Sequence, residues 1–252
     1  MKIFLDTANV DEIREMAALG LIDGVTTNHS LMAKVGPTDY RNVVRELCYL
    51  VQGPISAEVT SPVTEGMIAE TREIVQWSPY VVVKVPFLVE GLEVMRALRH
   101  HHADPDTICQ GCPWLGVCDT PLEMAQELVQ ARPVQFNVTL VFSANQALLA
   151  AKAGATYVSP FIGRLDDAGH EGMDVIREIR AIFDNFGFET QILTASVRHP
   201  RHLTDAAMVG SDVITVPYGV LKKALGHPLT DKGQAAFLAD WQAVRKELAS
   251  RG

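Results

Sequence analysis

The chain has 252 residues, of which 48% are hydrophobic, so it is long and apolar enough to bury a sizeable core. Its formal net charge is −8 and it contains no basic run, which argues against a nucleic-acid partner. No apolar run approaches the ~18 residues of a membrane span, and the first residues lack the layout of a signal peptide. We therefore expect a cytoplasmic protein without a membrane partner, in which the four cysteines are reduced thiols.

Short apolar stretches alternate with amphipathic ones along the chain. The expected strands are residues 2–5, 22–26, 55–59, 80–85, 135–141, 156–159, 190–194 and 212–216. The expected helices are residues 10–19, 38–51, 63–77, 91–102, 144–153, 172–186, 200–209 and 218–225. Eight strand–helix units in ~250 residues predict an α/β fold, a single (β/α)8 TIM barrel over residues 1–252. An open flavodoxin-like sheet is the alternative.

One connection between a predicted helix and the next strand is unusually long. Between the fourth helix and the fifth strand lie about 30 residues, roughly 103–133, where ~2–6 are usual, so we predict an insertion that contains a helix over 121–131. Cys109, Cys112 and Cys118, with histidines nearby, have the ligand types of a Cys3His zinc site. Their spacing is irregular and no second Cys-x2-Cys follows, which favours free thiols. We expect no metal.

A lysine lies inside the continuous apolar run of residues 80–87. Such a run is typical of a strand buried on both faces in a parallel sheet. Burial disfavours the charged form of a lysine and leaves a nucleophilic amine, which Schiff-base chemistry on a carbonyl substrate requires. Lys84 is therefore the candidate nucleophile. The alternative is a lysine at a strand end whose ammonium group reaches water.

Polar residues gather at or near the C-terminal ends of the predicted strands, where barrel enzymes carry their chemistry. They are Asp6, Asn28, Glu58, Lys84, Asn137, Thr139, Ser159, Arg164, Ser196 and Arg198. One such residue in a barrel core is ordinarily hydrogen-bonded packing. One or two from each of seven strands, with both signs of charge, indicate an active site.

The chemistry of these side chains indicates their roles. Asp6 or Glu58 would transfer protons during imine formation and at the hydroxyl group whose C–C bond breaks. Asp6 could instead be a carboxylate at a helix N-terminus. Arg164 and Arg198 would bind a terminal anion such as a phosphate. Arg164 could instead form a surface ion pair with one of the two following aspartates. The expected ligands of sugar hydroxyl groups are Asn28, Asn137 and Ser159.

Five motifs resemble those of the transaldolase family, the lysine Schiff-base aldolases with a (β/α)8 barrel, and most closely its small-subunit branch. They are Phe4-Leu5-Asp6-Thr7-Ala8, Gly24-Val25-Thr26-Thr27-Asn28, Val83-Lys84-Val85-Pro86, the run of residues 137–146, and Ala153-Gly154-Ala155 to Arg164-Leu165-Asp166-Asp167. The resemblance runs from residue 2 to about residue 230, outside the insertion.

The resemblance implies a transaldolase that passes a dihydroxyacetone unit from a ketose phosphate to an aldose phosphate, with no cofactor. Lys84 would form the imine, Asp6 would be the acid/base, and Glu58 and Thr139 would position the catalytic water. The dihydroxyacetone moiety would contact Asn28, Asn137 and Ser159, and the phosphate end would contact Arg164, Ser196 and Arg198.

The same branch contains fructose-6-phosphate aldolases, which release the three-carbon unit. They typically carry glutamine and tyrosine where this chain has Glu58 and Phe161, a pair that resembles transaldolases, and the resemblance implies that Phe161 also contacts the substrate. Transfer is therefore favoured over cleavage. The sequence is also compatible with a related anionic substrate such as a sulfonated ketose, with an aldolase acting on deoxyribose phosphate, and with a binding protein that has lost catalysis.

Two further features bear on substrate and assembly. His29 stands where the family has a proline, which is a tolerated loop change, an altered substrate contact or an extra acid/base group. The branch commonly assembles as rings of five, often paired to ten, so the resemblance implies a homo-oligomer. A C-terminal helix over 234–249 has an apolar face that includes Phe237 and Trp241. This face would pack on a neighbouring copy or on its own barrel.

Overall fold

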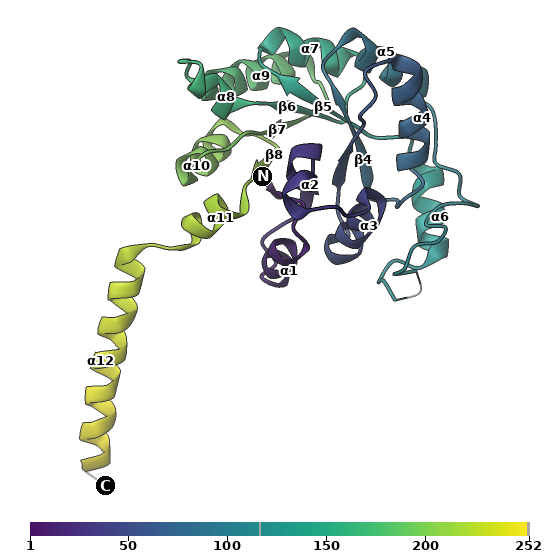
Figure 1. Cartoon of the computed structure of the whole chain (residues 1–252). Coiled ribbons are helices and arrows are strands. Elements are labelled where there is room, and N and C mark those ends of the chain that lie inside the picture. The colour runs from purple at the N-terminus through teal and green to yellow at the C-terminus, as the bar shows by residue number, and fades with distance from the viewer. Residues whose placement is uncertain (116, 251–252) are drawn as a thin grey trace.

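The computed structural model describes residues 1–115 and 117–250 and contains a closed barrel of eight parallel strands (Figure 1). In barrel order the strands are β1 Lys2–Asp6, β2 Gly24–Thr26, β3 Ile55–Glu58, β4 Val81–Pro86, β5 Phe136–Val141, β6 Tyr157–Pro160, β7 Gln191–Thr194 and β8 Val213–Val216. Strand β1 pairs with both β2 and β8, so the sheet has no free edge. The predicted (β/α)8 barrel is confirmed, and the open-sheet alternative is wrong.

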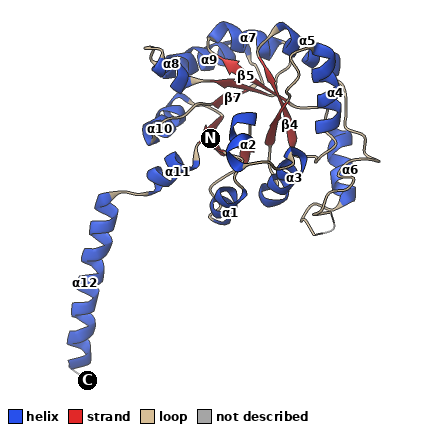
Figure 2. Ribbon diagram, in the orientation of Figure 1, coloured by secondary structure: helices blue, strands red, loops and turns tan. Residues whose placement is uncertain are grey.

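Helices surround the strands on the outside of the barrel (Figure 2). They are α1 Val10–Ala18, α2 His29–Val35, α3 Tyr40–Val51, α4 Thr64–Ile74, α5 Val89–Leu98, α6 Leu122–Ala131, α7 Ala144–Lys152, α8 Ile162–Asp167, α9 Gly172–Phe186, α10 Pro200–Val209, α11 Tyr218–Leu225 and α12 Pro228–Ser250. The short helices α2 and α8 are additions to the predicted elements. Helix α2 is seven residues long and begins where the Asn28 side chain accepts a hydrogen bond from the Leu31 N–H.

The barrel interior contains a buried apolar layer. Its residues are Phe4, Val82, Tyr157, Leu193, Ala195 and Val213, with Phe161 packed against them. Side chains two positions apart on a strand point to the same face, so the next inward position on several strands holds a polar residue. These positions are Asp6 after Phe4, Lys84 after Val82, Ser159 after Tyr157 and Thr215 after Val213. A polar layer therefore lies directly above an apolar floor.

The alternation on β4 explains why its sequence is apolar on both sides of the lysine. Val83 and Val85 are fully buried in the larger apolar cluster that also includes helix residues such as Val94 and Met95 of α5. Val82 and Lys84 face the other way, into the barrel. The strand is covered by helices on one face and by barrel side chains on the other.

The insertion and the C-terminal helix take different forms. Helix α6 lies within the 103–133 insertion. Helix α12 begins at Pro228 rather than at residue 234, has no buried residue and extends away from the barrel (Figure 1). Its apolar side chains do not pack on the chain's own barrel. Among residues 1–115 and 117–250, no helix combines the length and apolar composition needed to span a membrane.

Candidate active site

Lys84 is enclosed in the barrel. Its residue exposure is 5%, and the β3–β4 register places it beside Glu58. Lys84 Nζ donates a hydrogen bond to the Thr27 carbonyl oxygen at 3.3 Å and lies 3.6 Å from Glu58 Oε2. The amine therefore has an acceptor and a carboxylate within the barrel. The alternative of an ammonium group that reaches water at a strand end is wrong.

Asp6 lies at the end of β1, where hydrogen bonds link its carboxyl group to the hydroxyl groups of two threonines. Thr26 Oγ1 donates to Asp6 Oδ1 at 2.7 Å and lies 2.6 Å from Thr215 Oγ1. Burial of the carboxyl group raises the pKa of Asp6 above its usual value, and the Thr26 hydrogen bond and the charge of Lys84 oppose this rise. The cap of helix α1 is the Asn9 side chain, so Asp6 is not a helix-capping carboxylate.

A hydrogen-bonded row crosses the barrel close to the lysine. Ser159 Oγ donates to Asn137 Oδ1 at 2.6 Å, and Asn137 Nδ2 donates to Ser56 Oγ at 3.0 Å. Asn137 is fully buried, so it holds Ser159 in place from behind. Thr139 Oγ1 is buried without a hydrogen-bond partner in the structure. An unsatisfied hydroxyl group beside an active site is available to a substrate or a water molecule.

Strand β5 is distorted just after Thr139, the last of the inward-facing polar residues on this strand. The β5–β6 register shifts between Val138 and Val141, and Leu140 adopts a left-handed backbone conformation with φ of 58°. A bulge of this kind re-aims side chains next to an active site. Here the distortion lies at Thr139 and Leu140, which both line the cleft.

The two candidate arginines are held differently. The Arg164 guanidinium carbon lies 4.8 Å from the centre of the Phe161 ring, a cation–π contact. Arg198 Nη2 lies 2.8 Å from Asp167 Oδ2 in an exposed ion pair. The alternative in which Arg164 pairs with a following aspartate is wrong, because Asp167 pairs with Arg198 and Asp166 Oδ1 accepts from the Gly172 N–H.

A close backbone approach brings the arginine loops together. Gly163 N–H donates to the Ser196 carbonyl oxygen at 3.1 Å, and Ser196 has a positive φ of 61°. A Cβ atom on Gly163 would lie 2.0 Å from that carbonyl oxygen and 2.7 Å from Arg198 Cγ. Only glycine allows this contact, which sets the distance between α8 and the loop that carries Ser196 and Arg198.

Two adjoining cavities form the cleft above the polar layer, and both contain Lys84, Asn28, Phe161 and Arg164. The first, of about 190 Å³, is also lined by Asp6, Ser159, Ser196 and Arg198. The second, of about 640 Å³, is also lined by His29, Lys34, Glu58 and Thr139. The structure thus brings together ten of the eleven predicted site residues around Lys84, and Asn137 lies behind Ser159.

The sequence does not predict the contacts that Tyr40, His29 and the Thr26–Thr215 pair make at the cleft. Tyr40, from α3, accepts a hydrogen bond from the Glu58 N–H at 2.8 Å, and its hydroxyl group lies 2.9 Å from Thr27 Oγ1. Burial raises the pKa of Tyr40 to about 12, so it stays a neutral phenol. His29 Nε2 lies 3.1 Å from the Glu58 carbonyl oxygen. The third contact is the Thr26–Thr215 pair, although Thr26 lies in a motif that carries the resemblance.

The cysteine-rich insertion lies apart from this cleft. Within residues 1–115 and 117–250, no group of three or more His, Cys, Asp or Glu side chains is arranged to hold a metal ion. The four cysteines are free in the structure.

Comparison with known proteins connects this geometry to a family. The family model described as transaldolase/fructose-6-phosphate aldolase matches residues 3–251. A probable transaldolase of Desulforudis audaxviator is 50% identical over 246 residues, which covers 98% of this chain and all of the relative. Probable transaldolases of Dehalococcoides mccartyi and Petrotoga mobilis are 47% and 45% identical, over 98% and 100% of this chain and 100% and 99% of the relatives. The resemblance found in the sequence motifs is confirmed, and the chain belongs to the transaldolase/fructose-6-phosphate aldolase family.

Proposed function

We propose that this protein is a transaldolase that transfers a dihydroxyacetone unit between sugar phosphates through an imine on Lys84. The observation that carries the proposal is an enclosed amine 3.6 Å from the Glu58 carboxylate, in a cleft that Asp6 and two arginines also line. No metal or organic cofactor takes part in the proposed steps.

The first half-reaction begins at the ketone carbon of the donor sugar. The lone pair of the Lys84 amine attacks this carbon, and water is lost with a proton from Asp6 or Glu58 to give the protonated imine. The Asp6 carboxylate then takes the proton of the hydroxyl group on the carbon that leaves as the aldehyde, which is one end of the breaking C–C bond. The aldose phosphate leaves, and the electron pair of the broken bond is held as an enamine on Lys84.

The second half-reaction reverses these steps on another aldehyde. The enamine carbon attacks the acceptor, and Asp6 returns the proton to the new alkoxide oxygen. Glu58 and the unpaired Thr139 hydroxyl group hold the water that hydrolyses the imine. Fast capture of the enamine by an aldose phosphate separates transfer from simple cleavage.

Substrate position follows from the charges along the cleft. Arg164, Ser196 and Arg198 would hold the phosphate, and Ser159 with the Asn28 NH2 group would hold the hydroxyl groups of the three-carbon unit. Asn28 uses its carboxamide oxygen to cap α2, and its NH2 group can donate to a ligand. We place the reaction in the cytoplasm, because phosphorylated sugars carry charges that a bilayer interior excludes.

We further propose that helix α12 packs on a second copy of this chain. Its exposed apolar residues are Leu229, Phe237, Leu238, Trp241, Val244 and Leu248. Helix α12 extends away from its own barrel, so another protomer is the surface within reach of these side chains (Figure 1). A ring of five, alone or paired to ten, is the expected assembly.

The experiment that tests the reaction measures turnover of fructose 6-phosphate with and without erythrose 4-phosphate. Borohydride trapping of the imine is compared in the wild type, in Lys84→Ala and in the control Lys152→Ala, whose side chain is exposed on α7. Glyceraldehyde 3-phosphate formed only with the acceptor, and trapping lost only in Lys84→Ala, support a transaldolase.

Different results would identify a different reaction. Release of glyceraldehyde 3-phosphate without an acceptor would make the protein a fructose-6-phosphate aldolase. Trapping that depends on Lys84 without turnover would point to another anionic ketose, such as a sulfonated one, because sulfonate and phosphate oxygens suit the same arginines. Absence of Lys84-dependent trapping with every ketose tested would overturn the Schiff-base mechanism.

A further inference from the structure

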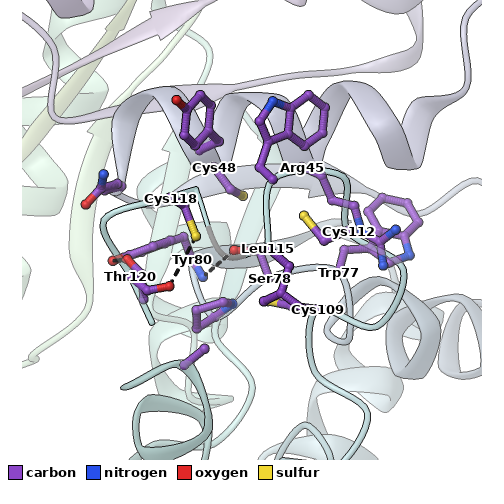
Figure 3. A pocket seen from close by; sticks show the side chains of 15 residues that line it. Arg45, Cys48, Trp77, Ser78, Tyr80, Cys109, Cys112, Leu115, Cys118 and Thr120 are labelled. Atoms are coloured by element: carbon purple, nitrogen blue, oxygen red, sulfur yellow. Dashed lines mark hydrogen bonds between the residues drawn. The ribbon is translucent and has the colours of Figure 1, made fainter. Parts of the chain in front are cut away.

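All four cysteines of the chain line one cavity of about 40 Å³ that shares no residue with the cleft of Lys84 (Figure 3). Cys109, Cys112 and Cys118 come from the insertion, and Cys48 comes from α3. Tyr49 and Trp114 stack at this cavity with ring centres 6.1 Å apart, joining α3 to the insertion. The proposed transfer reaction uses none of these side chains.

The four thiols are not equivalent. Cys48 is buried and hydrogen-bonded to Ser78, and burial raises the pKa of its thiol to about 12. The Cys118 thiol donates to the Thr120 carbonyl oxygen at 3.1 Å. These two thiols are therefore occupied as parts of the packing.

Cys109 and Cys112 form the ends of a tight turn. The Cys112 N–H donates to the Cys109 carbonyl oxygen at 2.9 Å. A turn closed by such a bond keeps its end Cα atoms within ~7 Å, a range that overlaps the spacing of disulfide-bonded cysteines. Cys109 itself has a left-handed backbone with φ of 60°. The Cα separation within this turn is thus compatible with a disulfide bond.

A buried arginine side chain lies behind this turn. Arg45 of α3 is 6% exposed and donates to the carbonyl oxygens of Gln110 and Gly111 at 2.6 and 3.2 Å. Its Nε has no hydrogen-bond partner, and no ion pair to Arg45 is found among residues 1–115 and 117–250. A nearby arginine favours the thiolate form of a cysteine, which is the nucleophile in disulfide exchange.

We propose that Cys109 and Cys112 form a reversible disulfide by exchange with small-molecule disulfides such as oxidised glutathione. Partly exposed Cys112 attacks one sulfur of the small disulfide, and its thiol proton passes to the small thiol that is released. Cys109 then attacks the Cys112 sulfur of the mixed disulfide and releases the second small thiol. The protein loses two hydrogens and two electrons, and the small disulfide gains them.

The geometry also assigns the order of attack. Burial raises the pKa of the Cys109 thiol to about 11, and the positive charge of Arg45 opposes this rise. Cys109 is buried, so a small disulfide reaches it less easily and it acts second, on a sulfur already held next to it by the turn. Cys112 reacts first because small disulfides can reach it.

The disulfide site lies against helix α3, which reaches the active-site cleft. Arg45 ties the turn to α3, and Tyr40 at the start of α3 bonds Glu58 and Thr27. Trp77 lines the cysteine cavity and packs on the Tyr40 ring with centres 5.6 Å apart. A disulfide bond across the turn would hold in place the Gln110 and Gly111 carbonyl oxygens, which accept hydrogen bonds from Arg45. Because Arg45 belongs to α3, the bond would also restrain α3.

The test equilibrates the full chain in glutathione buffers of graded oxidation, blocks free thiols and maps disulfides by mass spectrometry. We expect a bond between Cys109 and Cys112 that dithiothreitol reverses. Cys112→Ser should abolish it, whereas the matched control Cys118→Ser should keep it. Bonds that form instead to Cys48 or Cys118, or no protein disulfide in the most oxidised buffer, would overturn the proposal.

A second measurement follows α3. Hydrogen–deuterium exchange over residues 40–51 should be slower in the oxidised than in the reduced wild type, and equal under both conditions in Cys112→Ser. Equal exchange in oxidised and reduced wild type would overturn the link to α3. Both measurements are independent of whether the protein is a transaldolase.

Discussion

Glu58 and Lys84 are register neighbours on β3 and β4, and their charged groups lie 3.6 Å apart inside the barrel. The pairing of these two strands thus places an acid and an amine side by side. Lys84 Nζ also donates to the Thr27 carbonyl oxygen just after β2, so the amine contacts groups from two other parts of the barrel. This arrangement fixes the direction from which a carbonyl carbon can approach.

Glu58→Gln should reduce transfer by about 10²–10³-fold while imine trapping on Lys84 persists, because the amide cannot move a proton at the catalytic water. Steady-state turnover beside borohydride trapping measures both effects. Glu65→Gln, at the exposed first turn of α4, is the control and should behave as the wild type. Loss of trapping in Glu58→Gln would instead give Glu58 a role in forming the imine.

Asp6→Asn should stabilise the folded chain at neutral pH. The pKa of Asp6 is raised above 3.8 in the folded state, mainly by burial, so between the two values the folded chain binds more protons than the unfolded chain. The free energy of unfolding therefore falls as pH rises through the folded pKa, and the ionised carboxylate is destabilising at neutral pH.

Removal of that charge should raise the free energy of unfolding at pH 7. The gain should vanish as pH falls below 3.8, because the carboxyl group is then protonated in the folded and the unfolded state alike. Urea unfolding at a series of pH values measures it, with the exposed Asp174→Asn as control. A gain that is independent of pH would contradict the burial of the Asp6 charge.

Thr26→Val should move the acid limb of kcat/KM to higher pH. The hydrogen bond that Thr26 donates to Asp6 lowers the pKa of that carboxyl group, and the variant removes this bond. Thr190→Val removes a buried hydroxyl group that bonds the Ala155 carbonyl oxygen outside the cleft, and it serves as control. An acid limb that does not move would show that another group controls it.

Gly163→Ala should raise KM for a phosphorylated donor by about 10-fold or more with a smaller change in kcat. The new Cβ would meet the Ser196 carbonyl oxygen and Arg198, so the anion-binding loops must separate. Gly219→Ala is the matched control, because nothing lies within 4 Å of its Cβ position. Equal KM values for both variants would contradict the assignment of this loop pair to the phosphate.

Phe237→Asp on α12 should dissociate the oligomer to monomers, because a charge replaces an apolar contact between copies. Phe186→Asp is the control, since Phe186 is 74% exposed and Phe237 is 76% exposed. Light scattering of the purified proteins measures the mass. A monomeric wild type would overturn the proposed role of α12.

The sequence determined the barrel because its signals are local and repeated. Eight apolar runs followed by helical periodicity specify parallel strands with crossover helices, and eight such units in a chain of this length favour closure. Lys84, Asp6 and Glu58 could be found for the same reason, since each interrupts a strand at or near its C-terminal end.

Tertiary structure alone decided the contacts between strands. Tyr40 becomes a site residue only when helix α3 lies beside the barrel strands. Thr26 and Thr215 are 189 positions apart in the chain and meet only because β1, β2 and β8 lie side by side. The partner of Arg198, the need for glycine at position 163 and the gathering of four cysteines around one cavity have the same origin. Periodicity tells which face a side chain takes, but the register between strands tells which atoms it meets, and register is set by the packing of the whole barrel.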